Sequence, residues 1–418
     1  MKWNLSTFGQ QLGSDNGIDS LMQDLGVAMS GTQSYRMLGG GNPAHIPEVE
    51  AVWRERWEAI QASPGEVERI LGNYDTPQGS PVFLDAMADS LASRYGWPIS
   101  RENIAVVNGS QSAFFYLLNM FKGRNGTQFS RVLLPLNPEY IGYADQLLAP
   151  HAFTSAAPVV ELIGDHRFKY HIDFDQLEIT PETAAICVSR PTNPTGNVLT
   201  DEEMRRLDQL AGEYEIPLIV DNAYGAPFPD IMFSETKPVW TENTILAMSL
   251  SKLGLPGTRT GIVVASAEVI RRIGSINAVC GLANGNIGQA IAAPLLSNGL
   301  LYELSSEVIR PYYEAKSKQA LAWLDQYLPA DIPYRIHVSE GALFLWLWLP
   351  SLPISSSELY VRLKKRGVLV VSGHYFFYGL PEPHEHQDRC LRLSYALNAE
   401  DVEAGIAILA DEVSAIHQ

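Results

Sequence analysis

The sequence has few cysteines and few basic residues. Its 418 residues include Cys187, Cys280 and Cys390, which are far apart and odd in number. This pattern excludes a disulfide framework and is typical of a reducing compartment, so all three are expected to be buried as small apolar side chains. Lys and Arg number 30 against 47 Asp and Glu, a formal net charge of -17. Such a charge disfavours nucleic acid and anionic membrane surfaces as partners.

Long apolar runs are also missing. No window reaches the roughly 18 apolar residues of a membrane span, and the N-terminal stretch MKWNLSTFGQQLGSDNG lacks the apolar core of a signal peptide. The sequence contains no repeats or low-complexity tracts, so order is expected over nearly the whole length. The expected location is the cytoplasm.

Short apolar runs alternate with helical patterns over much of the chain. Runs such as NIAVVNG, AAICVS and IPLIVDN have the composition of buried parallel strands. Helical patterns stand between most of them, for example DEEMRRLDQLAGEYE after the N-cap candidate Thr200. The alternation predicts an α/β fold with a mostly parallel sheet between helices, which is expected to form a large domain over residues 51–298.

The pattern changes near Gly299. A long helical stretch, interrupted or kinked at Pro311, leads to the strand patterns GALFLWLWLP, GVLVVSG and CLRLSYAL and to an amphipathic final helix. Residues 299–418 are therefore expected to form an interdomain helix and a smaller α+β domain. Residues 1–50 are expected to form an N-terminal arm and part of that smaller domain.

Four polar motifs follow or adjoin predicted strands. Ligands of open α/β sheets bind at the carboxyl ends of strands, so each motif is a candidate binding element. The motifs are NGSQ at 108–111, NPTGN at 193–197, DNAY at 221–224 and SLSKLGLPGTR at 249–259. Asn193, Asp221 and Lys252 are 28 and 31 residues apart, about one strand-helix-strand step each. They can therefore line neighbouring strand ends.

Taken singly, each motif is also an ordinary turn or helix cap. Together they supply a helix N-terminus for a dianionic phosphate, a carboxylate for a ring nitrogen and an amine for an aldehyde. Pyridoxal 5'-phosphate carries all three of the matching groups. The sequence therefore predicts this cofactor and no metal.

At these motifs the chain resembles the fold type I pyridoxal-phosphate aminotransferases, whose motifs occur in the same order. The resemblance implies an aspartate-aminotransferase-like fold, a homodimer, and amino acids and 2-oxo acids as substrates. Longer stretches between LGGGNPAHIPE and SLSKLGLPG, at residues 38–257, are similar to the valine-pyruvate branch of that family. This similarity implies ping-pong transfer of an amino group between valine/2-oxoisovalerate and pyruvate/alanine.

The resemblance also assigns roles around the cofactor. Lys252 is expected to form the internal aldimine and to carry a proton between substrate and cofactor. Asp221 is expected to pair with the ring nitrogen, and Tyr224 and Asn193 with the phenolic oxygen. The expected phosphate contacts are Ser110, Gln111, Ser249, Ser251 and Arg259.

Further roles follow from the same resemblance. Tyr140 is expected to stack on the cofactor ring, and Tyr74 to reach the phosphate of the neighbouring subunit. Arg392 would bind the substrate α-carboxylate with its two-pronged guanidinium, a geometry that lysine lacks. Gly41 would let the backbone approach the substrate, and a structural role is expected for His374. The bonds Asn137–Pro138 and Asn193–Pro194 are candidate cis bonds.

Two other functions remain open at this point. A lyase that cleaves a Cβ–S bond with the same cofactor would keep Lys252, Asp221 and Arg392. A regulator with an aminotransferase-like domain would need a DNA-binding segment, for which the first 50 residues are too short and insufficiently basic. Product analysis separates the lyase from the transaminase.

Overall fold

The computed structural model describes residues 4–13, 17, 22–23, 26, 35–125, 128–146, 148 and 152–418. The chain forms two compact units. The first comprises Met1–Gly41, Leu118–Leu199 and Tyr313–Gln418, and the second comprises Asn42–Leu117 and Thr200–Tyr312. The domain boundaries expected at residues 50 and 298 stay a prediction.

The second unit contains strands in the order β1-β10-β9-β8. Their bounds are Ile104–Asn108 for β1, Thr260–Val264 for β10, Thr244–Ser249 for β9 and Leu218–Asp221 for β8. Strands β8 and β9 are parallel, whereas β10 is antiparallel to both of its neighbours. All residues of β8, β9 and β10 are buried, as expected for strands covered on both faces.

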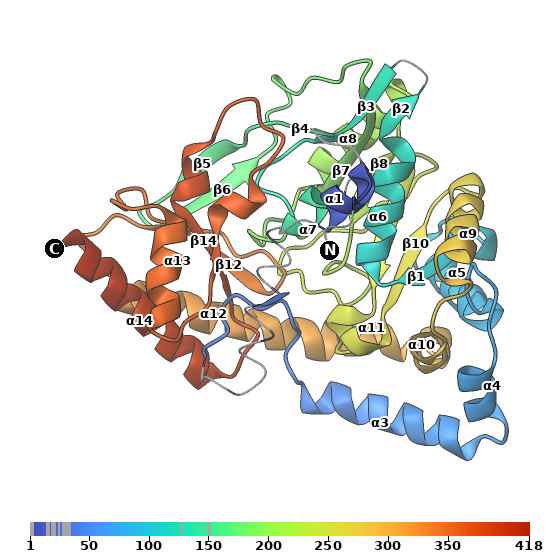
Figure 1. Ribbon diagram of the computed structural model, residues 1–418. Coiled ribbons are helices and arrows are strands. Elements are labelled where there is room, and N and C mark those ends of the chain that lie inside the picture. The colour runs from blue at the N-terminus through green and yellow to red at the C-terminus, as the bar shows by residue number, and fades with distance from the viewer. Residues whose placement is uncertain are drawn as a thin grey trace. The chain divides into compact units, whose positions relative to one another are not determined.

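Helices pack around these strands, and Figure 1 shows α5, α9 and α10 near β1 and β10. The helices in this part of the chain are α3 (Pro47–Ala62), α4 (Glu66–Gly72), α5 (Pro81–Tyr95), α6 (Ser110–Phe121), α8 (Asp201–Glu213), α9 (Ala267–Gly281), α10 (Ile287–Ser297) and α11 (Leu300–Glu303). Short 3-10 turns occur at Arg101–Asn103, Ser251–Leu253 and Pro256–Thr258. The predicted N-cap of α8 is confirmed, because Thr200 Oγ1 accepts a hydrogen bond from Glu203 N at 3.1 Å.

The first unit contains two groups of strands. In one group, β3 (Gln128–Leu134) pairs in parallel with β7 (Thr183–Ser189) and β4 (Phe153–Ser155), and antiparallel with β2 (Gly123–Asn125). The other is a six-stranded sheet in the order β13-β14-β12-β11-β6-β5. Its strands are β5 (Val159–Ile163), β6 (Arg167–His171), β11 (Arg335–His337), β12 (Phe344–Trp348), β13 (Val371–Ser372) and β14 (Cys390–Ser394).

Helix α13 lies beside β14 in Figure 1, and α14 packs against α13. The helices of this unit are α1 (Thr7–Leu12), α7 (Ile141–Ala144), α12 (Arg310–Tyr327), α13 (Ser356–Lys365) and α14 (Ala399–His417), with 3-10 turns at Gly373–Phe376 and Glu385–Asp388. A π-helical turn at Leu304–Ile309 separates α11 from α12. The predicted interruption near Pro311 is thereby confirmed, since proline has no N–H to continue a regular helix.

Two smaller expectations are wrong. Cys280 is exposed, although Cys187 and Cys390 are buried. Cys280 lies near the end of α9 beside Val279, which is 88% exposed, so this end of the helix faces outward. Asn137–Pro138 is cis as expected, but Asn193–Pro194 keeps the trans form that is the more stable one for most such bonds.

Within the described residues, none of the helices combines the length and the apolarity that a bilayer crossing needs. The same part of the chain shows no group of three or more His, Cys, Asp or Glu side chains that could hold a metal ion.

Candidate active site

In the second unit, the ends of three strands and the start of a fourth lie along one edge of the sheet. Asn108, the last residue of β1, is opposite Thr260 of β10, and Gly261 is opposite Ser249 of β9. Asp221 is the last residue of β8, the parallel neighbour of β9. The motifs that the sequence analysis singled out in this unit therefore follow neighbouring strand ends.

Two glycines let the backbone approach closely at this edge. A Cβ on Gly261 would lie 2.6 Å from Ser110 N, and a Cβ on Gly109 would lie 2.0 Å from Arg259 Nη2. Gly109 also has a φ of +80°, which favours glycine. The N-terminus of α6 and the Arg259 guanidinium thus meet in a space that any side chain would fill. Helix N–H groups and a guanidinium are suitable donors for a phosphate.

Two serines lie next to this space. Ser249 Oγ donates to Ser251 Oγ at 2.9 Å and accepts from Ser251 N at 3.0 Å. Gly261 is opposite Ser249 in the strand pairing and closely approaches Ser110. Ser249 and Ser110 therefore both lie next to Gly261. Gln111 is half-buried in the first turn of α6. The predicted phosphate ligands of this unit are therefore grouped around one strand junction.

Lys252 follows Ser251 in the 3-10 turn after β9. Its Nζ lies 5.4 Å from the centroid of the Tyr224 ring, and Tyr224 and Asp221 are both buried. Trp53 of α3 fixes the turn, because its Nε1 donates to Leu253 O at 3.2 Å. No local signal in the sequence indicates this role of Trp53, which has the appearance of an ordinary helix-core residue. The half-buried Lys252 amine thus lies near the buried Tyr224 ring, on a turn that Trp53 holds in place.

Arg392 of β14 is a buried cation in the first unit, with 2% of its surface exposed. Its Nη1 donates to Asn193 Oδ1 at 2.7 Å and its Nη2 to Gly39 O at 2.7 Å. The guanidinium carbon also lies 4.2 Å from the centroid of the Phe344 ring and 5.3 Å from that of Phe376. Since arginine only donates, the first bond fixes the Asn193 oxygen toward Arg392 and turns the amide nitrogen away from it. Asn193 can therefore donate to another group.

Gly39 was missed by the sequence analysis, which selected Gly41. A Cβ on Gly39 would lie 3.1 Å from Val370 O, whereas the corresponding position at Gly41 has no heavy atom of the described chain within 4 Å. The GGGN run offers no local signal that separates the two. Gly39 is the one that supplies the carbonyl to Arg392.

Tyr140 is held from several sides in the first unit. Its ring meets the Tyr143 ring edge-on, with 5.2 Å between centroids, and a Cβ on Gly142 would lie 2.3 Å from it. Tyr378 Oη donates to Tyr140 O at 2.8 Å. Burial, followed by the nearby Glu139 carboxylate, raises the pKa of Tyr378 well above its usual value, so this hydroxyl stays protonated and able to donate.

Glu139 is a second residue that the sequence analysis missed. It is 1% exposed, and its carboxylate accepts from Ser189 N at 2.9 Å, from Tyr140 N at 3.0 Å and from the Ser189 hydroxyl. The carboxylate joins the loop after β3 to the end of β7. A charged residue inside the apolar run LLPLNPEYIGY is the signal that could have identified it.

Two predicted residues lie apart from these groups. Tyr74 stands on the loop between α4 and α5 and is 80% exposed. His374 Nδ1 lies 2.8 Å from Ser372 Oγ and 2.9 Å from Ser357 Oγ, and burial lowers its pKa. A neutral ring bonded to two hydroxyls suits the structural role expected for His374.

Residues 57–409 match the family described as Aminotransferase class I and II. The chain belongs to this family. It is 48% identical over 409 residues to the valine-pyruvate aminotransferase of Escherichia coli (strain K12), covering 98% of this chain and 97% of the relative. The structure of the valine-pyruvate aminotransferase from Salmonella typhimurium LT2 has a TM-score of 0.88 and 48% identity, covering 96% of this chain and 99% of that chain. A protein from Psychrobacter arcticum 273-4 has a TM-score of 0.96 and 44% identity, covering 100% of this chain and 99% of its own.

This class I and II aminotransferase is a pyridoxal-phosphate-dependent transaminase with an aspartate-aminotransferase-like α/β fold, which confirms the fold class, enzyme class and cofactor expected from the sequence. The residues present fit the cofactor. The glycine-lined space at Ser110 and Arg259 has donors that suit a phosphate, and Lys252 and Asp221 are an amine and a carboxylate of the kinds that the cofactor needs.

Proposed function

We propose that this enzyme transfers an amino group between L-valine/2-oxoisovalerate and pyruvate/L-alanine. The observation that carries the proposal is the 48% identity to the valine-pyruvate aminotransferase of E. coli over almost the whole chain. The buried guanidinium of Arg392, bonded to Asn193, supports it because this geometry suits the α-carboxylate that all four substrates share.

Bound pyridoxal phosphate supplies an aldehyde and an electron-withdrawing ring that stabilises negative charge on the substrate Cα. In this proposal Lys252 would hold the cofactor through its amine and would move the proton at the substrate Cα. The Asp221 carboxylate keeps the ring nitrogen protonated. A charge pair at about 4 Å with an effective dielectric of about 20 contributes on the order of 4 kcal/mol, or about three pKa units.

The other predicted residues bind and orient. Tyr224 and the Asn193 amide nitrogen donate to the phenolic oxygen, and Tyr140 packs against the ring. The phosphate ligands in this proposal are Ser110, Gln111, Ser249, Ser251 and Arg259. Arg392 orients the substrate through its carboxylate, and Gly41 lies in the segment that approaches it.

Steady-state assays test the substrate pair directly. With pyruvate as acceptor, valine is expected to be the best donor in a panel that includes glutamate and aspartate, and alanine is expected to form in equal amount. Lys252→Ala is expected to lose this activity and the absorbance band of lysine-bound cofactor. A preference for glutamate or aspartate would exclude the proposed substrates, and release of pyruvate and ammonia without an added oxo acid would indicate a lyase.

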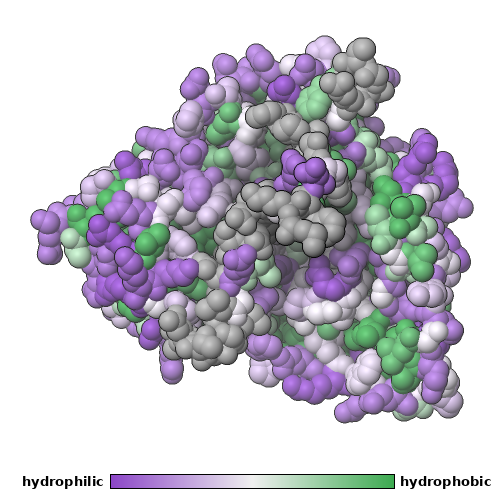
Figure 2. Space-filling view, in the orientation of Figure 1, coloured by the Kyte–Doolittle hydropathy of each residue, from purple (hydrophilic) through white to green (hydrophobic). Residues whose placement is uncertain are grey.

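We also propose that the enzyme is a homodimer in which Tyr74 reaches the neighbouring site. Asn277 Nδ2 donates to Pro77 O at 2.8 Å and Asn286 Nδ2 to Asn73 O at 3.0 Å, which ties α9 and the start of α10 to the Tyr74 loop. Exposed apolar side chains surround this junction: Leu71, Tyr74, Val82, Val279 and Leu282. Figure 2 shows green, apolar surface around the place where Figure 1 labels α10. Exposed apolar surface is found at many protein interfaces.

Mixed dimers test this arrangement. Lys252→Ala and Tyr74→Ala subunits, each nearly inactive alone, are to be unfolded and refolded together. If Tyr74 acts across the interface, each mixed dimer contains one intact site, so about a quarter of the wild-type activity is expected to return. If Tyr74 acts within its own subunit, no intact site forms and mixing restores nothing.

A further inference from the structure

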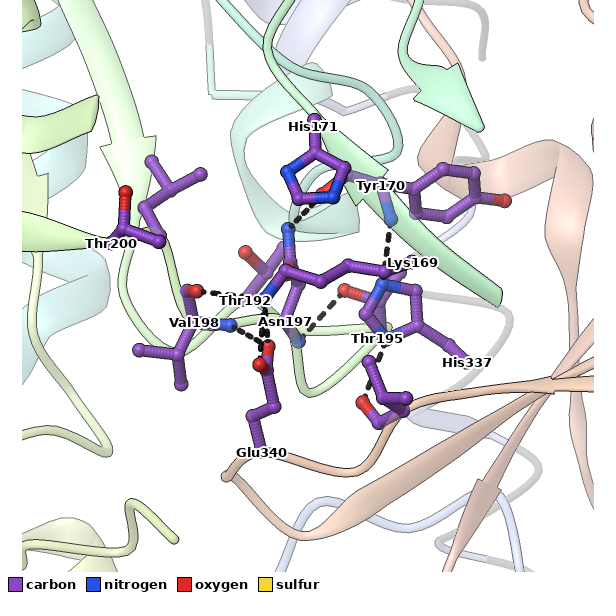
Figure 3. A network of polar contacts seen from close by, with 12 residues as sticks. Lys169, Tyr170, His171, Thr192, Thr195, Asn197, Val198, Thr200, His337 and Glu340 are labelled. Carbon is purple, nitrogen blue, oxygen red and sulfur yellow. Dashed lines mark hydrogen bonds and ion pairs between the residues drawn. The ribbon is translucent and has the colours of Figure 1, made fainter. Parts of the chain in front are cut away.

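A partly buried ion pair in the first unit, with 10% of the Lys169 side chain and 23% of the Glu340 side chain exposed, binds the loop that carries Asn193. Lys169 Nζ lies 2.6 and 2.5 Å from the two carboxylate oxygens of Glu340, and Lys169 is 8% exposed. The carboxylate also accepts from Val198 N at 3.0 Å, and Lys169 Nζ donates to Val198 O at 3.3 Å. Figure 3 shows the Glu340 carboxylate pointing at Val198 and Lys169. One ion pair therefore holds both backbone groups of a single loop residue.

The neighbouring turn connects this point to Asn193. Thr192 N donates to Asn197 O at 2.8 Å and Gly196 N donates to Thr192 O at 2.8 Å, which closes the turn 192–197. The Asn197 amide also donates to the backbone of β6 at 3.2 Å. Gly196 has a φ of +71°, and a Cβ there would lie 2.8 Å from Gly341 O. Asn193 therefore stands on a closed turn that is pressed against the segment bearing Glu340.

An ion pair that binds a backbone group away from water has a high desolvation cost. Two ions lose their hydration when they are buried, so an ion pair of this kind often adds little to fold stability. A neutral side chain binds another backbone group in the same network: His337 is fully buried and accepts from Tyr170 N at 3.1 Å. Burial lowers the pKa of His337 to about 3, so its ring is neutral. The charged pair, by contrast, stands where a loop has to be fixed, and charge-assisted hydrogen bonds fix geometry strongly.

We propose that Lys169 and Glu340 are positioning residues for the amino-transfer reaction. They fix Val198, and through the turn 192–197 they hold Asn193 in hydrogen-bonding contact with Arg392. Neither residue touches the reacting atoms in this proposal; both act through Asn193. The proposal rests on the proposed function, in which Asn193 and Arg392 bind cofactor and substrate.

A double-mutant cycle separates this role from general stabilisation. Glu340→Ala is expected to lower kcat/KM by about tenfold to a hundredfold, as displacements near 1 Å do in active sites. If Glu340 acts through Asn193, the variant carrying both Asn193→Ala and Glu340→Ala is expected to be within about twofold of Asn193→Ala alone. Independent effects that multiply in the double variant would overturn the proposal.

Asp325→Ala is the matched control. Asp325 pairs at 2.5 Å with Arg167, which lies two residues before Lys169 on β6. Within the described residues, neither member of this pair forms a hydrogen bond to the Asn193 loop. The kcat/KM of the Asp325→Ala variant is expected to match that of the wild type.

If Glu340→Ala does not fold, Glu340→Gln takes its place, because glutamine loses the charge and keeps an oxygen that can accept from Val198 N. A smaller loss of kcat/KM is then expected. An unchanged kcat/KM in the folded Glu340 variant would also overturn the proposal.

Hydrogen exchange provides a readout that needs no cofactor. In the apoprotein, Glu340→Ala is expected to speed exchange of the amides of residues 192–198 by about tenfold or more, and Asp325→Ala is expected to leave them unchanged. Unchanged exchange in Glu340→Ala would contradict the proposal. Failure of the proposed function would look different, because the wild-type protein itself would then lack amino transfer while the exchange comparison still held.

Discussion

Replacing Gly261 with alanine is expected to weaken cofactor binding without unfolding the protein. The new Cβ would lie 2.5 Å from the carbonyl carbon of Gly109 and 2.6 Å from Ser110 N, whereas ordinary Cβ contacts begin at 3.4 Å. Strand β10 and the Gly109–Ser110 turn after β1 must therefore separate locally by about 0.9 Å. This is the point where the α6 N-terminus is proposed to bind the phosphate. We expect a tenfold to hundredfold loss of affinity, or about 1.4 to 2.7 kcal/mol.

The assay is titration of the apoprotein with pyridoxal phosphate, followed by absorbance. Gly257→Ala is the matched control, because it makes the same chemical change in the turn between Lys252 and Arg259. A Cβ on Gly257 has no heavy atom of the described residues within 4 Å. The control is expected to bind within about twofold of the wild type.

One result would refute the reasoning. If Gly261→Ala folds with a normal circular dichroism spectrum and binds the cofactor as tightly as Gly257→Ala does, the close approach at Ser110 does not serve the phosphate. The strongest support for a phosphate site at Ser110 would be a Gly261→Ala variant that binds pyridoxal phosphate more weakly but binds pyridoxal, which lacks the phosphate, as tightly as the wild type does.

Two further predictions concern single charges. Arg392→Lys is expected to raise the KM for amino acids and oxo acids by about tenfold to a hundredfold, with a smaller change in kcat, because an ammonium cannot form the paired bonds of a guanidinium; an unchanged KM in steady-state assays would argue against a carboxylate at Arg392. Burial raises the pKa of Asp230 from 3.8 to about 6, against the opposing effect of Arg310. The folded protein then binds the proton more tightly than the unfolded chain, so this group lowers stability as the pH rises from about 4 to 6, by up to about 3 kcal/mol. Urea unfolding at pH 4.5 and 7 is expected to show that the Asp230→Asn variant gains stability relative to the wild type at the higher pH, and a pH-independent difference would contradict this.

The strands and the motif turns were predictable because their signals are local. Runs such as NIAVVNG and IPLIVDN are apolar, short and bounded by turn residues, and the structure has β1 and β8 there. The antiparallel direction of β10 was not predictable, since GIVVAS has the same composition as a parallel strand. Strand direction depends on the path of the chain between strands, which composition does not record.

The residues that support the site were harder to find. Lys252 and Asp221 stand in recognisable motifs, whereas Glu139, Gly39 and Trp53 take their roles from partners far along the chain. Trp53, for example, bonds to a residue 200 positions away. Contacts of that kind appear only after folding, so no local pattern could separate Gly39 and Trp53 from ordinary turn or core residues. Glu139 is the exception, because a carboxylate within an apolar run is itself a local signal.

The antiparallel pairing of β9 and β10 has one more consequence. The chain leaves β9 at Ser249, passes Lys252 and returns as β10 opposite the same serine, with Arg259 just before the strand begins. Lys252 and Arg259, the proposed attachment amine and phosphate ligand, therefore belong to one short connection whose two ends are held together by strand pairing. In the proposed site, this connection limits how far apart the two groups can lie. A cofactor analogue with a longer or shorter arm between its aldehyde and its anion is therefore expected to bind more weakly than pyridoxal phosphate.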